Sequence, residues 1–244
     1  MKPLSSYAEM DALGRNLSDE YNRQTGKKNV KCFDIVGFIT DYLNLSIVYE
    51  TFGEEYASKY GFLSDGFTPL VVFRDGKQTS VIFSENTIVI DNFLKRKEEM
   101  ARWRYTLAHE AAHYILKKHT PLQTRAAFST EFDKEANNTI AELRSQMNFN
   151  EVFANRLGAA LLINDEKLCA AVAKYTGGKT LPCYEGEFFT EKDKLFFNKL
   201  KNNLGVSYSA LINRIRDLGL IEWKPFSEYS QNVLGFGVEV NGTI

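Results

Sequence analysis

The stretch from Glu98 to Lys118, EEMARWRYTLAHEAAHYILKK, constrains the fold more than any other part of the chain. It contains no proline or glycine and ends in two lysines, which suit a helix C-terminus, so it predicts one long α-helix. Apolar residues flank its polar centre on most sides: Leu107, Ala108, Ala111, Ala112, Ile115 and Leu116. We therefore expect a buried helix that carries His109, Glu110 and His113 into the core, where these side chains need partners.

The chain has three histidines, and two of them stand four residues apart around a glutamate. Residues four apart lie on the same face of an α-helix, so the imidazoles of His109 and His113 can share one cation. In the H-E-x-x-H pattern two such nitrogens hold Zn²⁺, and the carboxylate takes a proton from water that the metal acidifies. The pattern thus predicts one zinc ion per chain, with Glu110 as the acid/base. His119, at the helix exit, is expected on the surface.

A catalytic zinc usually has three protein ligands, so a carboxylate must supply the third. Two glutamates compete, Glu135 in a polar segment that resembles a solvated surface, and Glu151 in an apolar helix. We favour Glu151, because its helix places Ala154 and Gly158 on the same stripe, and small residues let two helices approach closely. Asn155 follows one turn later and is placed to orient a ligand. The alternative role of Glu151 is that of an acid at a helix N-terminus.

Strand patterns precede the histidine helix. Residues 69–83 form two β-rich runs around Asp75-Gly76, a strong hairpin signal, and residues 45–50 and 86–92 read as further strands. The segment 86–92 fits two roles equally, an interior strand or an edge strand that pairs with an extended substrate. These runs predict a small mixed or antiparallel sheet.

Helices are expected on either side of these strands. An amphipathic helix spans residues 7–21, and a short one follows Asp34, a plausible N-cap. The sequence therefore indicates an α+β fold. We expect one domain over residues 1–175 and a helical region over 176–244, packed on the core.

The C-terminal region has the sequence pattern of a helix-turn-helix. Two helices are expected over 191–205 and 207–221, with Gly205 at the turn. Residues 190–224 hold seven Lys or Arg against four Asp or Glu, a surplus of three. That surplus is small for duplex binding, where several phosphates must be neutralised. We favour a structural or substrate-docking role over direct nucleic-acid binding through 190–221.

Composition limits the partners and the cellular compartment that we expect for this chain. The net charge of −1 gives no argument for nucleic acid or an anionic membrane as partner. Three cysteines without a CxxC pair argue against a disulfide framework and for a reducing cytoplasm. The longest apolar run, LGAALLI, is too short to span a bilayer, and the N-terminus has no signal-peptide core. A cytoplasmic protein without a membrane partner is expected.

Two stretches together resemble the ImmA/IrrE family of zinc metallopeptidases. RWRYTLAHEAAHYIL is similar to that family's R-x-T-x-A-H-E-x-x-H signature, and EVFANRLGAALLI to its E-x-x-A-N-x-x-A-x-x-L-L-M-P segment. NTIVIDN upstream and LGVSYSALINRIRDLGLI downstream extend the resemblance over most of residues 30–221. Three positions depart from the family pattern, Ala112 for glycine, Gly158 for alanine and Asn164 for proline, and none removes a chemical group.

The resemblance implies a zincin-like core, with His109, His113 and Glu151 as zinc ligands and Glu110 as the catalytic acid/base. It also implies a regulatory endopeptidase that cuts a DNA-binding repressor of the helix-turn-helix type. Tyr105, Tyr114, Arg104 and Arg156 are candidates to assist the oxyanion, and the sequence favours packing or surface roles for all four. Mn²⁺ stays open as an alternative metal. The rival interpretation is a non-catalytic DNA- or protein-binding regulator that uses a metallopeptidase-like fold as a sensor or scaffold.

Overall fold

The computed structural model describes residues 6–27, 30–56, 59–119, 128–130, 149–178 and 180–233. The chain divides into two compact units. Unit 1 holds Met1–Asn164 with Leu204–Ser207, and unit 2 holds Asp165–Asn203 with Tyr208–Ile244. A domain boundary after residue 175 stays a prediction. None of the helices within the described ranges is both long and apolar enough to cross a membrane.

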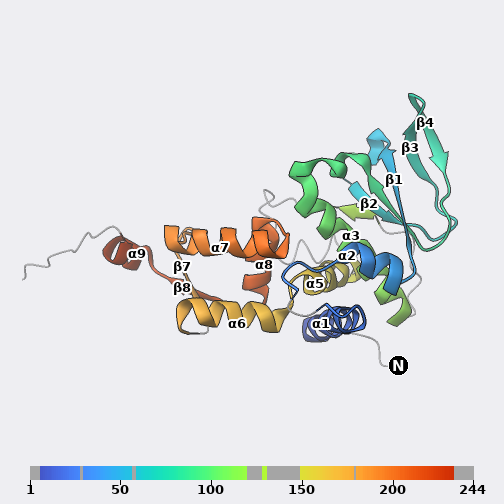
Figure 1. Ribbon diagram of the computed structural model, residues 1–244. Coiled ribbons are helices and arrows are strands. Elements are labelled where there is room, and N and C mark those ends of the chain that lie inside the picture. The colour runs from blue at the N-terminus through green and yellow to red at the C-terminus, as the bar shows by residue number, and fades with distance from the viewer. Residues whose placement is uncertain are drawn as a thin grey trace, which may run out of the picture. The chain divides into compact units, whose positions relative to one another are not determined.

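A six-stranded mixed sheet forms one layer of unit 1, with strand order β4-β3-β1-β5-β2-β6. Figure 1 labels four of its strands, β1 to β4. Its strands are β1 (Ser46–Phe52), β2 (Lys59–Leu63), β3 (Leu70–Arg74), β4 (Lys77–Val81), β5 (Thr87–Asp91) and β6 (Phe128–Thr130). β1 and β5 run parallel, and the other neighbouring pairs are antiparallel. The predicted α+β class and the mixed sheet are confirmed.

The hairpin between β3 and β4 turns at Asp75 and Gly76, as their sequence predicts. Both residues have positive φ, 51° and 73°, which is the requirement of a type I′ turn. The strands pair in register from Leu70 opposite Val81 to Arg74 opposite Lys77. Local turn chemistry therefore fixes this part of the sheet.

β5 lies inside the sheet, not at its edge. It pairs with β1 on one side and with β2 on the other, and all five of its residues are buried. Both of its hydrogen-bonding edges are occupied, so the hypothesis that 86–92 pairs with a substrate strand is wrong. The interior role, which was the equal alternative, is the one observed.

Helices cover the sheet and one another in unit 1. They are α1 (Tyr7–Gln24), α2 (Ile35–Gly37) running into the π-helix η1 (Phe38–Tyr42), α3 (Met100–His119) and α5 (Phe149–Leu162). Short 3₁₀ turns occur at η2 (Glu54–Tyr56), η3 (Asn92–Lys95) and η4 (Lys97–Glu99). α3 packs against β2 and β5 on one side and against α5 on the other, and α1 packs on α5 (Figure 1). The histidine helix is thus the central layer.

Helix ends follow the local sequence. Ser6 caps α1 in a capping box with Glu9, whose carboxylate accepts a hydrogen bond from the Ser6 amide at 3.0 Å. Asp34 caps α2, as predicted, by accepting a bond from the Gly37 amide at 3.1 Å. These caps fix where the chain enters α1 and α2.

Unit 2 contains α6 (Asp165–Thr176), β7 (Leu181–Tyr184), α7 (Glu191–Leu204), α8 (Tyr208–Asp217), β8 (Ile221–Lys224) and α9 (Phe226–Val233). Both predicted C-terminal helices are present, as α7 and α8, but the second ends at Asp217 and not at residue 221, because the chain turns at Gly219, which has a positive φ, and Ile221 begins β8. β7 and β8 form a separate two-stranded parallel sheet, which the sequence reading did not anticipate.

Candidate metal centre

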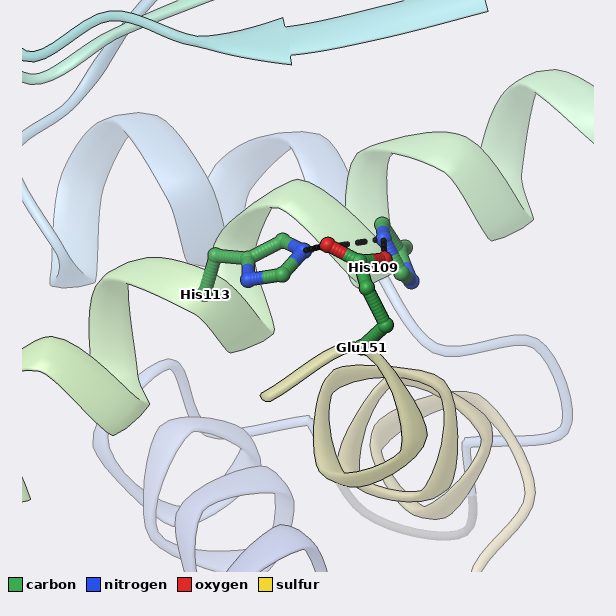
Figure 2. A group of neighbouring side chains, drawn as sticks. All are labelled: His109, His113 and Glu151. Carbon is green, nitrogen blue, oxygen red and sulfur yellow. Dashed lines mark hydrogen bonds and ion pairs between the residues drawn. The ribbon is translucent and has the colours of Figure 1, made fainter. Parts of the chain in front are cut away.

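Three side chains converge between α3 and α5. The Nε2 atoms of His109 and His113 lie 3.0 Å apart, and the carboxylate of Glu151 lies 3.3 Å from the first and 3.2 Å from the second. Figure 2 shows both rings from α3 turned toward the carboxylate that rises from α5. Among the residues that the structure describes, these three side chains form the group of His, Cys, Asp or Glu that could hold a metal ion, with ligand atoms all within 4.8 Å of one another.

Close packing of the two helices makes this convergence possible. α3 runs across the view in Figure 2 while α5 is seen almost end-on, so the helices cross steeply. At the crossing, a Cβ atom on Gly158 would stand 3.1 Å from the amide nitrogen of His109 and 3.2 Å from the carbonyl carbon of Ala108. Glycine therefore lets the α5 backbone approach α3, and the small-residue stripe predicted from the sequence serves this purpose.

Burial and mutual contacts set the charges of the cluster. Burial alone would raise the pKa of Glu151, but hydrogen bonds from His109 and His113 outweigh it and lower that pKa to about 2. Burial lowers the pKa of His113. The carboxylate is therefore ionised at neutral pH, and the His113 ring is held neutral, which is the form that binds metals.

The donor set fits a zinc ion. In tetrahedral geometry, ligand bonds of about 2.0–2.1 Å place the ligand atoms roughly 3.3 Å apart. The three spacings of 3.0, 3.2 and 3.3 Å are close to that value. Two ring nitrogens and a carboxylate point at one position, and together they have more lone pairs than hydrogen atoms to share between them. A cation at that position can accept a lone pair from each of the three groups.

Glu110 lies beside this cluster and is fully buried. Burial and the nearby Glu151 carboxylate raise the pKa of Glu110 well above its usual range. A hydrogen bond from the Leu63 backbone acts in the opposite direction and lowers this pKa, but by less than burial and Glu151 raise it. A buried acid of this kind, next to a candidate metal site, is typical of a group that exchanges protons during a reaction.

Tyr105 and Asn155 form a second link between the same two helices. The Tyr105 hydroxyl donates toward the Asn155 side-chain oxygen at 3.3 Å and its backbone oxygen at 3.4 Å. Tyr105 stands one turn before His109 on α3, and Asn155 one turn after Glu151 on α5. The sequence placed Asn155 on this face but did not pair it with Tyr105. Its role in orienting a ligand stays a prediction.

The other candidates for oxyanion assistance have structural partners. The Arg104 guanidinium donates to the carbonyl oxygens of Gly205, at 3.0 Å, and Phe33. The Arg156 guanidinium donates to both carboxylate oxygens of Asp11, one at 2.8 Å. Tyr114 is buried, with the Lys118 ammonium 4.4 Å from its ring centroid. These contacts agree with packing roles.

Two residues considered from the sequence cannot be placed. Glu135, the competing third ligand, lies outside the described residues, and so does the side chain of His119. The choice of Glu151 therefore rests on its own geometry.

A family model described as an IrrE N-terminal-like domain, Peptidase_M78, matches residues 40–216. The matched range is well over half of the chain and includes α3 and α5, which carry the three converging side chains. No curated protein matches the chain to a significant degree.

Proposed function

Because the chain belongs to the Peptidase_M78 family of IrrE N-terminal-like domains, we propose that it is a zinc-dependent endopeptidase of regulatory type. The observation that carries the proposal is the convergence of His109, His113 and Glu151 at 3.0–3.3 Å beside the buried Glu110. The family supports a metallopeptidase, and the donor set supports zinc as its metal.

His109, His113 and Glu151 would hold the ion, and together they bring two neutral rings and one negative charge to it. When bound, zinc supplies Lewis acidity, which makes an attacking water more acidic and a peptide carbonyl more electrophilic. Tyr105 and Asn155 join the ligand-bearing helices one turn away and so restrict their relative movement.

Glu110 would move the proton. As water attacks the peptide carbonyl, its carboxylate accepts the proton and then delivers it to the leaving amine. A carboxyl whose pKa is raised by burial and by Glu151 suits the second step, because it holds the accepted proton until the leaving amine takes it.

The proposed substrate is a DNA-binding repressor of the helix-turn-helix type, cut at a specific peptide bond. This part of the proposal rests on the family resemblance of the sequence, in which such repressors are the usual targets. With such a substrate, the proposed location of the protein is the cytoplasm.

The experiment incubates the zinc-loaded chain with helix-turn-helix repressors encoded beside it and follows the products by mass spectrometry. Glu110→Gln is the matched control, since it keeps the volume and removes the base. We expect one cleavage product that appears with the wild type and is lost both in Glu110→Gln and after chelation.

A cut that persists in Glu110→Gln at the wild-type rate would exclude this mechanism. If the wild type binds such a repressor tightly without cutting it, the scaffold alternative would replace the peptidase.

A further inference from the structure

β2 carries an irregularity next to the metal centre. Lys59 pairs with Thr130 and Phe62 with Phe128, so three steps along β2 match two steps along β6. The extra residue falls at Tyr60–Gly61, and on its other side Gly61 pairs with Ile90 of β5. Bulges with a glycine frequently mark places where something must approach the backbone closely, often beside active sites.

At this bulge, the side chain of Glu110 occupies the space that a side chain at position 61 would take. A Cβ atom on Gly61 would lie 2.6 Å from Oε1 and 3.0 Å from Cγ of Glu110. It would also lie 2.5 Å from Cγ2 of Thr106, one turn earlier on α3. Ordinary contacts between such atoms are about 3.5–4.0 Å, so a side chain at position 61 and the observed position of the Glu110 side chain exclude each other.

We propose that Gly61 is a positioning residue for the reaction: its missing side chain sets where the Glu110 carboxylate lies relative to His109, His113 and Glu151. The inference rests on the proposed function, because it takes Glu110 as the group that moves the proton. Gly61 itself touches neither substrate nor metal in this account.

A methyl group at position 61 should displace the carboxylate more than it disturbs the fold. The atoms it meets all belong to side chains and none to the backbone. The long Glu110 side chain can rotate away more readily than the β-branched Thr106, whereas parting β2 from α3 would open the buried layer between them. The main effect of Gly61→Ala is therefore expected at the metal centre.

Gly53 provides a matched control in the same unit. A Cβ atom there would lie 2.9 Å from Cγ1 of Val71, a side chain at β3, where β1 pairs with β3. Gly53→Ala thus introduces similar crowding away from Glu110.

The test uses Co²⁺ alone as probe, since its visible absorption reports the ligands and geometry around the ion. Four chains are compared: wild type, Gly61→Ala, Glu110→Ala and the double variant, with Gly53→Ala as control. We expect Gly61→Ala to change the Co²⁺ spectrum in the same direction as Glu110→Ala, and the double variant to match Glu110→Ala alone. Gly53→Ala should keep the wild-type spectrum. A wild-type spectrum for Gly61→Ala, or an additional change in the double variant, overturns the proposal.

Urea unfolding of the same metal-free chains separates this inference from the proposed function. Because Glu110→Ala removes two of the three crowded atoms and leaves only Cγ2 of Thr106, Gly61→Ala should lower the unfolding midpoint by less in that background than in the wild type. Equal losses in the two backgrounds overturn the proposal whether or not metal binds. A wild type that takes up no Co²⁺ and no Zn²⁺ refutes the proposed peptidase, while the unfolding comparison still decides the role of Gly61.

Discussion

The buried ion pair between Asp11 and Arg156 gives a prediction whose size follows from its geometry. Both side chains are nine-tenths or more buried, at the contact between α1 and α5. The guanidinium donates to both carboxylate oxygens and lies 5.4 Å from the ring centroid of Tyr7. Asp11→Ala would leave the Arg156 charge buried without this carboxylate.

Breaking a buried pair from one side costs about 3–5 kcal/mol, because the remaining charge stays desolvated. An exposed pair costs only about 0–1 kcal/mol. With a urea dependence of about 1–3 kcal/mol per molar, Asp11→Ala should lower the midpoint of unit 1 by about 1 M or more. Replacing both partners, as Asp11→Leu with Arg156→Met, should restore most of the loss, because neither charge is then buried.

Unit 1 can be followed by itself, because the chain has two tryptophans, one in each unit. In a Trp223→Phe background the fluorescence comes from Trp103, on α3, whose indole donates to the Tyr49 hydroxyl at 3.1 Å. Glu85→Ala, which breaks the exposed pair with Lys117, is the control and should cost under about 1 kcal/mol. A loss from Asp11→Ala no larger than this control would refute the reasoning.

Two further changes test the crossing of α3 and α5. Gly158→Val should lower Zn²⁺ affinity by about tenfold or more in metal titrations, because it forces the ligand-bearing helices apart. Ala159→Val on the same helix is the control and should leave the affinity unchanged. Equal affinities in the two variants would show that close approach of the helices does not determine zinc binding. Tyr105→Phe, which removes the hydroxyl that donates to Asn155, should reduce the free energy of unfolding by about 1 kcal/mol in urea titrations; an unchanged value would mean that this bond adds no net stability.

Features set by local chemistry could be predicted from the sequence. The turn at Asp75-Gly76, the cap at Asp34 and the spacing of His109 and His113 each depend on residues within a few positions of one another. Glu151 could be chosen because the helix period placed it on the stripe of Gly158. The turn, the cap and the histidine spacing needed no knowledge of which segments meet in space, whereas the choice of Glu151 also assumed that its helix packs against the histidine helix.

Features that depend on distant partners could not be predicted. The ion pair of Asp11 and Arg156 joins residues 145 positions apart. The five residues of β2, KYGFL, include Gly61 and give a weak strand signal. That they form a strand, and that Gly61 lies against Glu110, is seen only once β5, β6 and α3 are in place around them. The assignment of 86–92 as interior or edge strand likewise required the strand order, which local alternation does not encode.

The most direct test of the central claim is the zinc content of the purified chain, measured by mass spectrometry together with unfolding as a check of folding. The account predicts about one zinc per wild-type chain and per Glu85→Ala control chain, and its loss in folded His113→Ala and Glu151→Ala. A wild type that cannot take up zinc, or zinc retained in both site variants, would contradict it.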